Sequence, residues 1–217
     1  MTTSTTSTTS ALRRRALAHL RASDERIARV IERVGPCRFT ARAEGTHFDA
    51  LLRAIVYQQL SGKAASTILG RVLALYGNRY PTADELLATP EERLRAAGLS
   101  RQKLAYMRDL AAHVSGGTLA IDRIDVLGDA EIIEALTMVK GIGRWSAQMF
   151  LMFRLGRPDV LPETDLGIRK GLQRAYRMRS LPTPQKVQKV GECWSPYASY
   201  ASWYLWRLLD GDANLTD

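Results

Sequence analysis

The residues of this chain whose types and spacing could do chemistry lie between positions 136 and 169. Gly141-Ile142-Gly143 separates two apolar runs of helical spacing, and Asp165 starts a further helical segment. Glycine adopts backbone conformations closed to other residues and lets a ligand approach the chain closely. Amide groups at such a turn, and at the N-terminus of the helix after it, form an anion site that needs no side-chain charge. The pattern therefore predicts a phosphate-binding turn followed along the chain by one carboxylate.

Each feature also has a simpler interpretation. A helix commonly ends at a glycine, and an aspartate at a helix start is ordinary because it caps the first amides. Lys140 and Arg144 flank the turn and would strengthen an anion site, and Glu163 is the nearest alternative carboxylate to Asp165. From these residues alone, two interpretations remain possible: ordinary capped helices, or a functional site.

The elements that must position these residues are expected to be helices. Nearly every periodic segment has helical spacing, and none alternates as a strand does. We count about ten helices joined by short turns, which predicts an all-α chain. The clearest predicted helix starts are Ser61, Thr82, Asp129 and Thr183. The Ser/Thr-rich residues 1–10 have too little apolar surface to pack and are expected to form a disordered tail.

Composition narrows the class of partner. Lys and Arg outnumber Asp and Glu by 31 to 22, which favours an anionic partner such as nucleic acid. Cys37 and Cys193 have no metal-ligand spacing, which argues against a zinc site and against an iron–sulfur cluster. No apolar run reaches the roughly 20 residues that a membrane span needs, and the first ten residues lack the apolar segment of a signal peptide. We expect a cytoplasmic protein, nucleoid-associated if bacterial, with no membrane partner.

Four motifs carry a resemblance to a known family. They are AIVYQQLSGKAAS at 54–66, LTMVKGIGRWSAQMF at 136–150, LPETDLGIRKG at 161–171 and WSPYASYASWYLW at 194–206. In this order, and over roughly residues 48–210, the chain resembles the helix–hairpin–helix DNA glycosylases with a Gly/Pro-rich loop and an aspartate, specifically the 3-methyladenine DNA glycosylase II branch. The resemblance implies base flipping and hydrolysis of the N-glycosidic bond of alkylated purines (3-methyladenine, 7-methylguanine and related bases) in duplex DNA. The product would be an abasic site.

The same resemblance implies a fold and an oligomeric state. We expect one two-lobed helical domain over residues 11–217, with lobes of roughly 48–130 and 11–47 plus 131–217. No β domain is expected, because the residues that precede the family motifs leave no room for one. The protein should act on double-stranded DNA as a monomer.

The chemistry is expected to come from Asp165, which matches the family's catalytic aspartate. It would stabilise the positive charge that develops on the sugar and would orient or deprotonate the attacking water. Members that also cleave the strand carry a nucleophilic lysine where this chain has Trp145. A monofunctional enzyme is therefore expected; the alternatives are a bifunctional glycosylase/lyase and a helix–hairpin–helix DNA-binding protein without catalysis.

The remaining site residues are also implied by the resemblance. The base pocket would be lined by Trp145, Trp206, Tyr57 and Met149, with Tyr200 and Trp203 as weaker candidates. DNA would be contacted by Lys140, Gly141, Gly143, Arg144, Gln58 and Gln59, and the gap left by the flipped base would be filled by Arg101 or by Leu99. No cofactor is required, but a Na or K ion could be held by the backbone carbonyls of Thr137, Val139 and Ile142.

Two residues depart from the family pattern. Lys140 replaces a common proline, which loosens the turn but adds a cation beside the phosphate. Ala198 replaces an arginine in the last motif, so any contact of that arginine is absent or is made elsewhere.

Overall fold

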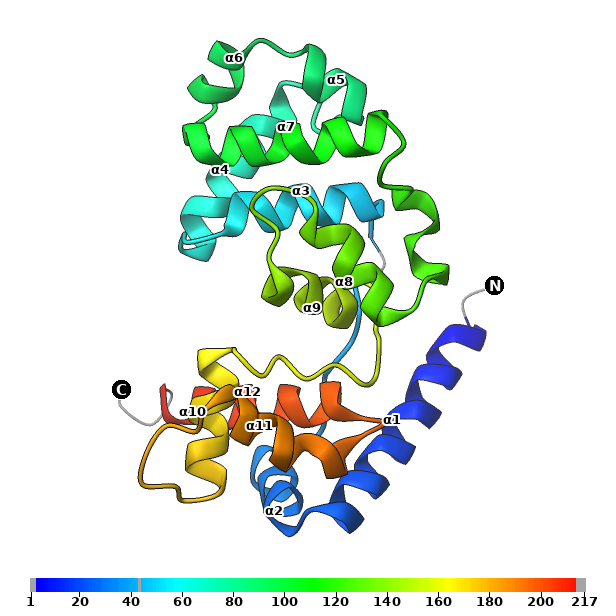
Figure 1. The fold of residues 1–217 in the computed structure, drawn as a ribbon, viewed down its shortest axis with the longest axis vertical. Coiled ribbons are helices and arrows are strands. Elements are labelled where there is room, and N and C mark those ends of the chain that lie inside the picture. The colour runs from blue at the N-terminus through cyan, green and yellow to red at the C-terminus, as the bar shows by residue number, and fades with distance from the viewer. Residues whose placement is uncertain (1–2, 43, 214–217) are drawn as a thin grey trace. The chain divides into compact units, whose positions relative to one another are not determined.

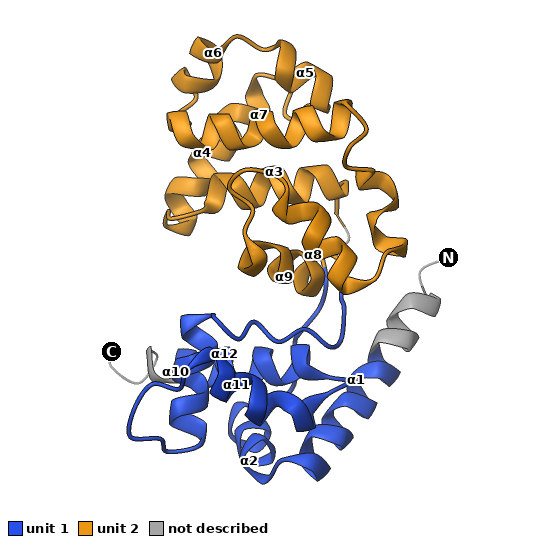
Figure 2. Ribbon diagram, in the orientation of Figure 1, with its two compact units in different colours: residues 1–41, 156–217 blue, residues 42–155 orange. Residues whose placement is uncertain are grey.

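The computed structural model describes residues 3–42 and 44–213, which form twelve α-helices and two short 3-10 helices with no strand (Figure 1). The prediction of an all-α chain is confirmed. The count slightly exceeds the roughly ten helices expected. None of the described helices combines the length and apolar character that crossing a membrane requires. The chain divides into two compact units, residues 1–41 with 156–217 and residues 42–155 (Figure 2).

Unit 1 is built around its last helix. It contains α1 (Thr3–Ser23), α2 (Glu25–Val34), α10 (Leu166–Ala175), α11 (Pro184–Gly191), η2 (Glu192–Trp194) and α12 (Ala198–Ala213). Helix α12 packs against α10 and α2, and Tyr204 and Trp194 are fully buried among these helices. At Gly171 an added Cβ would lie 2.6 Å from the Leu205 backbone oxygen, so glycine is what allows α10 to approach α12 this closely. This crossing places the start of α10 beside α12.

Unit 2 surrounds a long helix, α7. It contains α3 (His47–Tyr57), α4 (Gly62–Ala74), α5 (Ala83–Ala88), α6 (Glu91–Ala96), α7 (Arg101–Ser115), η1 (Ile121–Val126), α8 (Asp129–Thr137) and α9 (Arg144–Phe153). Helix α7 packs against α5, α6 and α3, while α8 and α9 pack against each other (Figure 1). The apolar faces of α3 and α7 supply much of the core, with Leu52, Ile55 and Met107 almost fully buried.

Most of the predicted helix starts are observed. The hydroxyls of Ser61, Thr82 and Thr183 each accept a hydrogen bond from the backbone N–H three residues on, as N-caps do. At the start of α8 the structure differs from the prediction, because Gly128 is the N-cap and Asp129 is the first helical residue. A local capping signal thus locates a helix start to within a residue.

The N-terminal segment and the lobe boundary differ from the sequence prediction. Helix α1 begins at Thr3, so residues 3–10 belong to a helix, and residues 1–2 lie outside the described part. Each Ser or Thr in a helix costs roughly a few tenths of a kcal/mol relative to Ala. A helix that is nucleated by the residues after position 10 can therefore extend back through them. Residues 131–155 belong to unit 2 and not with the chain termini, because α9 packs against both α8 and α3.

Candidate active site

Asp165 in unit 1 is held by two hydrogen bonds to one of its oxygens. It is the N-cap of α10, and its Oδ1 accepts the backbone N–H of Ile168 at 2.8 Å. The indole Nε1–H of Trp206 donates to the same oxygen at 2.8 Å. Asp165 is therefore a helix cap, as the simpler interpretation predicts. The cap alone does not account for the indole, which fixes the rotation of a half-buried carboxylate.

Gly167 allows Trp206 to reach this carboxylate. An added Cβ at Gly167 would lie 2.8 Å from Cδ1 and 2.9 Å from Nε1 of Trp206. Those distances are shorter than any normal carbon contact, so only glycine leaves room for the indole across the first turn of α10. The sequence prediction missed Gly167, although its place directly after Asp165-Leu166 was a signal. Trp206, expected as a pocket residue, lies beside the predicted catalytic carboxylate.

The glycine turn joins α8 to α9 in unit 2 and has the conformation that its sequence requires. Gly141 has φ +83°, in the left-handed region where a side chain is strained. The N–H of Ile142 donates to the carbonyl of Val139 at 3.1 Å, and both side chains are buried. Gly143 is the N-cap of α9 and supplies no side-chain cap. A helix start with only backbone at its cap is the arrangement in which the first amides and the helix dipole bind an anion.

Side chains of unit 2 hold this turn from outside. Gln58 donates its side-chain amide to the carbonyl of Gly141 at 2.8 Å. Asp109 accepts the backbone N–H of Lys140 at 2.8 Å, and its other oxygen lies 3.2 Å from the Lys140 ammonium. Gln58 therefore binds the hairpin, and Lys140 is paired with a carboxylate; the DNA contacts expected of both residues stay predictions. Sequence reasoning missed Asp109, because its partner is 31 positions away.

Asp109 carries its charge in a half-buried position. Burial raises the pKa of its carboxyl, but the hydrogen bonds from Lys140, with the ammonium of Lys140 and the nearby His113, lower it by more, so the net pKa is below the ordinary value. The carboxylate is thus stabilised as an anion by the residue that begins the turn.

The other residues predicted for the base pocket differ in exposure: several are exposed or half-buried, and Tyr200 lies in the core. Trp145 is 45% exposed on the first turn of α9, and Met149 is half-buried further along that helix. Tyr57 is half-buried at the end of α3, where the Arg53 guanidinium lies 4.0 Å from its ring centroid. Tyr200, by contrast, is a core residue in edge contact with Phe39.

The two wedge candidates differ in exposure. Leu99 is only 2% exposed and packs in the core of unit 2. Burial of its apolar side chain stabilises the fold, so Leu99 is unavailable as a wedge. Arg101 is exposed at the first position of α7. Gln59 is also exposed, and its φ of +56° places it in the left-handed region.

The carbonyls proposed for a monovalent cation lie at the end of α8 and in the turn. Thr137 is the last residue of α8, where helix carbonyls lack partners within the helix, so oxygen ligands of the kind such a cation takes are available there. The described residues contain no group of three His, Cys, Asp or Glu side chains that could hold a metal. Backbone carbonyls are the oxygen donors that the end of α8 offers to a monovalent cation.

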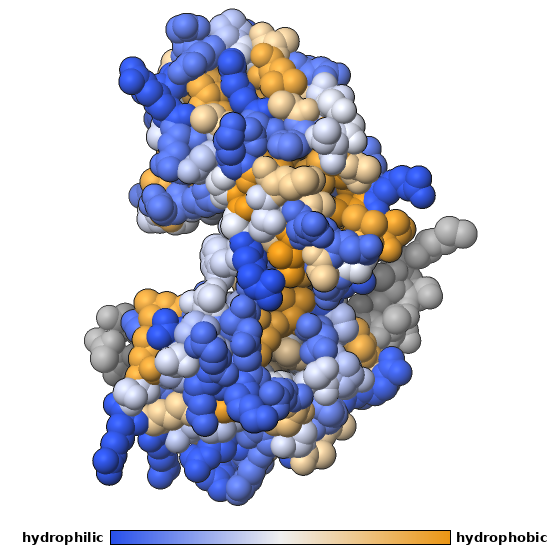
Figure 3. Space-filling model, viewed as in Figure 1, coloured by the Kyte–Doolittle hydropathy of each residue, from blue (hydrophilic) through white to orange (hydrophobic). Residues whose placement is uncertain are grey.

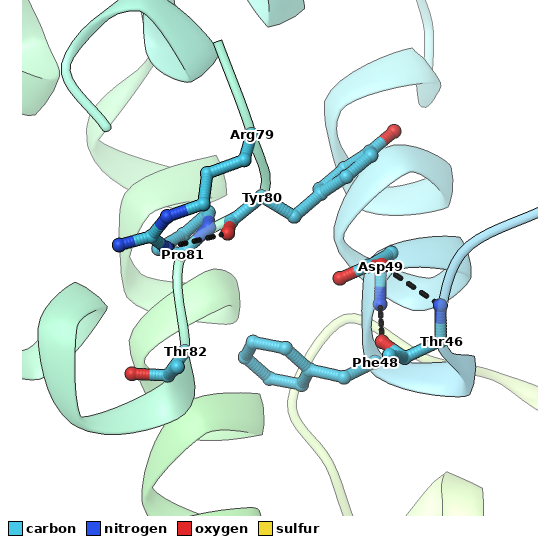
Figure 4. A pocket seen from close by; sticks show the side chains of 7 residues that line it. All are labelled: Thr46, Phe48, Asp49, Arg79, Tyr80, Pro81 and Thr82. Carbon is cyan, nitrogen blue, oxygen red and sulfur yellow. Dashed lines mark hydrogen bonds between the residues drawn. The ribbon is translucent and has the colours of Figure 1, made fainter. Parts of the chain in front are cut away.

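A surface pocket in unit 2 is separate from these residues (Figure 4). It lies between the starts of α3 and α5, and its polar groups already form hydrogen bonds with other groups of the protein. Thr46 and Asp49 exchange hydrogen bonds in a capping box, and Arg79 donates to the carbonyl of Tyr80 and pairs with Glu85. We interpret this pocket as the junction of two capped helices.

Comparisons with known proteins show the family to which the chain belongs. Residues 52–196 match the family model described as HhH-GPD superfamily base excision DNA repair protein. The chain is 37% identical to DNA-3-methyladenine glycosylase 1 of Schizosaccharomyces pombe over 87% of this chain and 84% of that protein.

Solved structures give the same result. A Schizosaccharomyces pombe 3-methyladenine DNA glycosylase in complex with abasic DNA matches with a TM-score of 0.78 and 35% identity, over 89% of this chain and 95% of that one. A DNA-3-methyladenine glycosidase of Bacillus halodurans matches with a TM-score of 0.82 and 36% identity, over 92% and 91%. The chain belongs to the HhH-GPD superfamily of base excision DNA repair proteins.

Proposed function

We propose that this chain is a monofunctional DNA glycosylase that hydrolyses the N-glycosidic bond of alkylated purines, 3-methyladenine first, in duplex DNA. The observation that carries the proposal is Asp165, held at the start of α10 by Ile168 and Trp206. It occurs in a chain 37% identical to a DNA-3-methyladenine glycosylase. The product is an abasic site, as in base excision repair.

One carboxylate suffices for this reaction. Cleavage of a glycosidic bond leaves positive charge on the sugar. A carboxylate about 4 Å away, at an effective dielectric constant of ~20, stabilises that charge by up to about 4 kcal/mol. That amounts to about a thousandfold in rate. The two donors on Oδ1 hold the carboxylate in place beforehand, so little reorganisation is needed as charge develops.

Asp165 also orients or deprotonates the attacking water. A strong general acid is not required, because an alkylated cationic purine is already a good leaving group. Trp145 stands where a lyase of this family has its lysine, which supports hydrolysis without strand cleavage.

The turn at 141–143 supplies the DNA contact. Its backbone amides, with those at the start of α9, bind a phosphate, and Arg144 adds positive charge beside them. The target base leaves the stack to reach the carboxylate. Trp206 lies beside Asp165, and the assignment of Trp145, Trp206, Tyr57 and Met149 to the base pocket stays a prediction. The monovalent cation, the monomeric state and the cytoplasmic location also stay predictions.

The test is release of 3-methyladenine from methylated duplex DNA. Asp165→Asn keeps an N-cap acceptor for Ile168 and Trp206 but removes the charge, so we expect base release to fall about a thousandfold, as the electrostatic argument gives. DNA affinity should change little. Trp206→Phe keeps an aromatic ring but removes the indole donor, so an intermediate loss is expected.

Two outcomes would contradict the proposal. A wild-type chain that binds DNA but releases no methylated base would favour the DNA-binding protein without catalysis. A covalent DNA adduct trapped by borohydride would show a glycosylase/lyase.

A further inference from the structure

One face of α7 is directed at the glycine hairpin of unit 2. Gln102, Tyr106, Asp109 and His113 are spaced by four, three and four residues, which places them on one side of a helix. Gln102 donates to the Tyr106 hydroxyl at 2.6 Å, and His113 Nε2 lies 3.7 Å from Asp109. Tyr106 and Asp109 are the two of these that meet the hairpin.

Tyr106 supports the turn by contact. A Cβ at Gly141 would lie only 2.1 Å from the Tyr106 ring, so the ring already packs against the Gly141 backbone. This contact stops the turn from moving toward α7, but it does not fix the peptide that enters it.

Asp109 fixes that peptide. Its Oδ2 accepts the backbone N–H of Lys140 at 2.8 Å, and its Oδ1 lies 3.2 Å from the Lys140 ammonium. Both ends of one carboxylate are thus held by the residue directly before the left-handed Gly141. The Asp109 side chain is 18% exposed, which limits the screening of its bond to the Lys140 amide by water, whereas the Lys140 side chain is 75% exposed and its ammonium is screened.

A turn with two glycines needs such an anchor. Glycine loses more conformational freedom on ordering than any other residue, and Lys140 lacks the ring by which a proline would fix its own φ. The pairing has an electrostatic consequence as well: the ammonium of Lys140 is largely offset by Asp109, so the anion site depends on backbone amides more than on this lysine.

We infer that Asp109 is a positioning residue for DNA-backbone binding: by holding the Lys140 amide it keeps the 140–143 hairpin in the form that receives a phosphate. The inference rests on the proposed function, since it takes DNA to be the ligand of the hairpin. It predicts that loss of the Asp109 side chain weakens DNA binding. A purely electrostatic argument predicts the opposite, because removing an acidic side chain beside a phosphate site would strengthen binding.

The experiment is equilibrium binding of a duplex that contains a stable abasic-site analogue. Asp109→Ala removes the acceptor of the Lys140 amide, and we expect the Kd to rise about tenfold, which corresponds to about 1.4 kcal/mol. Asp109→Asn keeps one acceptor oxygen and should be closer to wild type. Asp49→Ala is the matched control: Asp49 also accepts a backbone amide, that of Thr46 at 2.8 Å, but in a capping box away from the hairpin. Its Kd should equal that of wild type.

Two further variants separate the amide from the ammonium. Lys140→Pro removes the N–H that Asp109 accepts, so adding Asp109→Ala to it should change the Kd by less than about twofold, as expected when the shared contact is gone. Lys140→Ala keeps the N–H, so the effect of Asp109→Ala should persist there. The single-turnover rate of base release at saturating enzyme should be unchanged in Asp109→Ala while the half-saturating concentration rises, a split that general loss of structure would not produce.

The inference is overturned if Asp109→Ala and Asp109→Asn both bind the duplex as tightly as wild type or more tightly. It is also overturned if Asp109→Ala has the same effect in the Lys140→Pro chain as in wild type. A wild-type chain that does not bind duplex DNA overturns both this inference and the proposed function. One that binds but releases no base overturns only the proposed activity.

Discussion

At the scale of single residues, Asp165 shows why capping and catalysis are hard to separate in a sequence. Both uses call for a short carboxylate at a helix start, and the structure shows that Asp165 is a cap. What marks it further is the indole of Trp206, which comes from 41 positions away. The residues around Asp165 in the sequence do not indicate that contact. Only the resemblance of whole motifs to the family indicated both Asp165 and Trp206.

Asp109 and Tyr106 were missed for a related reason. The apolar face of α7 was evident from Leu104, Met107 and Leu110. The polar side of such a helix normally faces solvent, so a sequence gives no reason to assign it a partner. Here that side meets the hairpin.

Gln59 is a second candidate, beside Arg101, for the residue that fills the gap in the duplex. It is exposed in a left-handed conformation, which costs a non-glycine residue about 1 kcal/mol or more. Its neighbour Gln58 is bonded to the hairpin, so the turn is fixed relative to the predicted phosphate site. Gln59→Ala should therefore slow base release from duplex DNA about tenfold, as expected when unstacking energy is no longer offset, and should leave release from single-stranded DNA unchanged. Arg101→Ala serves as the comparison; a larger loss in that variant would assign the role to Arg101.

At the scale of elements, the sequence predicted what local chemistry determines. Ser61, Thr82 and Thr183 begin helices because their hydroxyls accept backbone amides within the next turn. The lobe boundary was not predictable in this way. The helix pair α8 and α9 belongs to unit 2 through contacts that are distant in sequence: α9 packs against α3, and the turn between α8 and α9 is bonded to Gln58 and Asp109.

The two hairpin glycines should respond differently to substitution. Gly141→Ala places a side chain at φ +83° and directs its Cβ into Tyr106. The left-handed conformation alone costs about 1–2 kcal/mol, so we expect the free energy of unfolding to fall by about 2 kcal/mol or more. At Gly143 an added Cβ meets nothing within 4 Å, so Gly143→Ala should cost less than about 1 kcal/mol, the preference of an N-cap for glycine over alanine. Chemical denaturation measures both; equal losses would show that Tyr106 and the left-handed backbone do not limit the turn.

At the scale of the whole molecule, the excess of basic residues is the property that a sequence states most directly. The formal net charge is +9, and hydrophilic residues cover most of the face shown in Figure 3. Composition indicated an anionic partner, and the order of four motifs indicated the family. Composition could not tell which charges are already paired, since Lys140 with Asp109 and Arg79 with Glu85 are identifiable only in the structure.

This pairing leads to a prediction about salt. DNA binding should weaken with added salt at a log–log slope of about −0.9 for each phosphate neutralised. Arg144→Ala, beside the hairpin, should reduce the magnitude of the slope by about 0.9 if Arg144 neutralises one phosphate. Lys140→Ala should reduce it by less than about 0.9, because Asp109 already offsets that ammonium. Arg79→Ala, whose partner Glu85 lies at the start of α5, should leave the slope unchanged. Titration of a labelled duplex at several salt concentrations measures all four slopes. A response to salt that is flat in the wild-type chain would mean that the positive charge does not lie at the DNA interface.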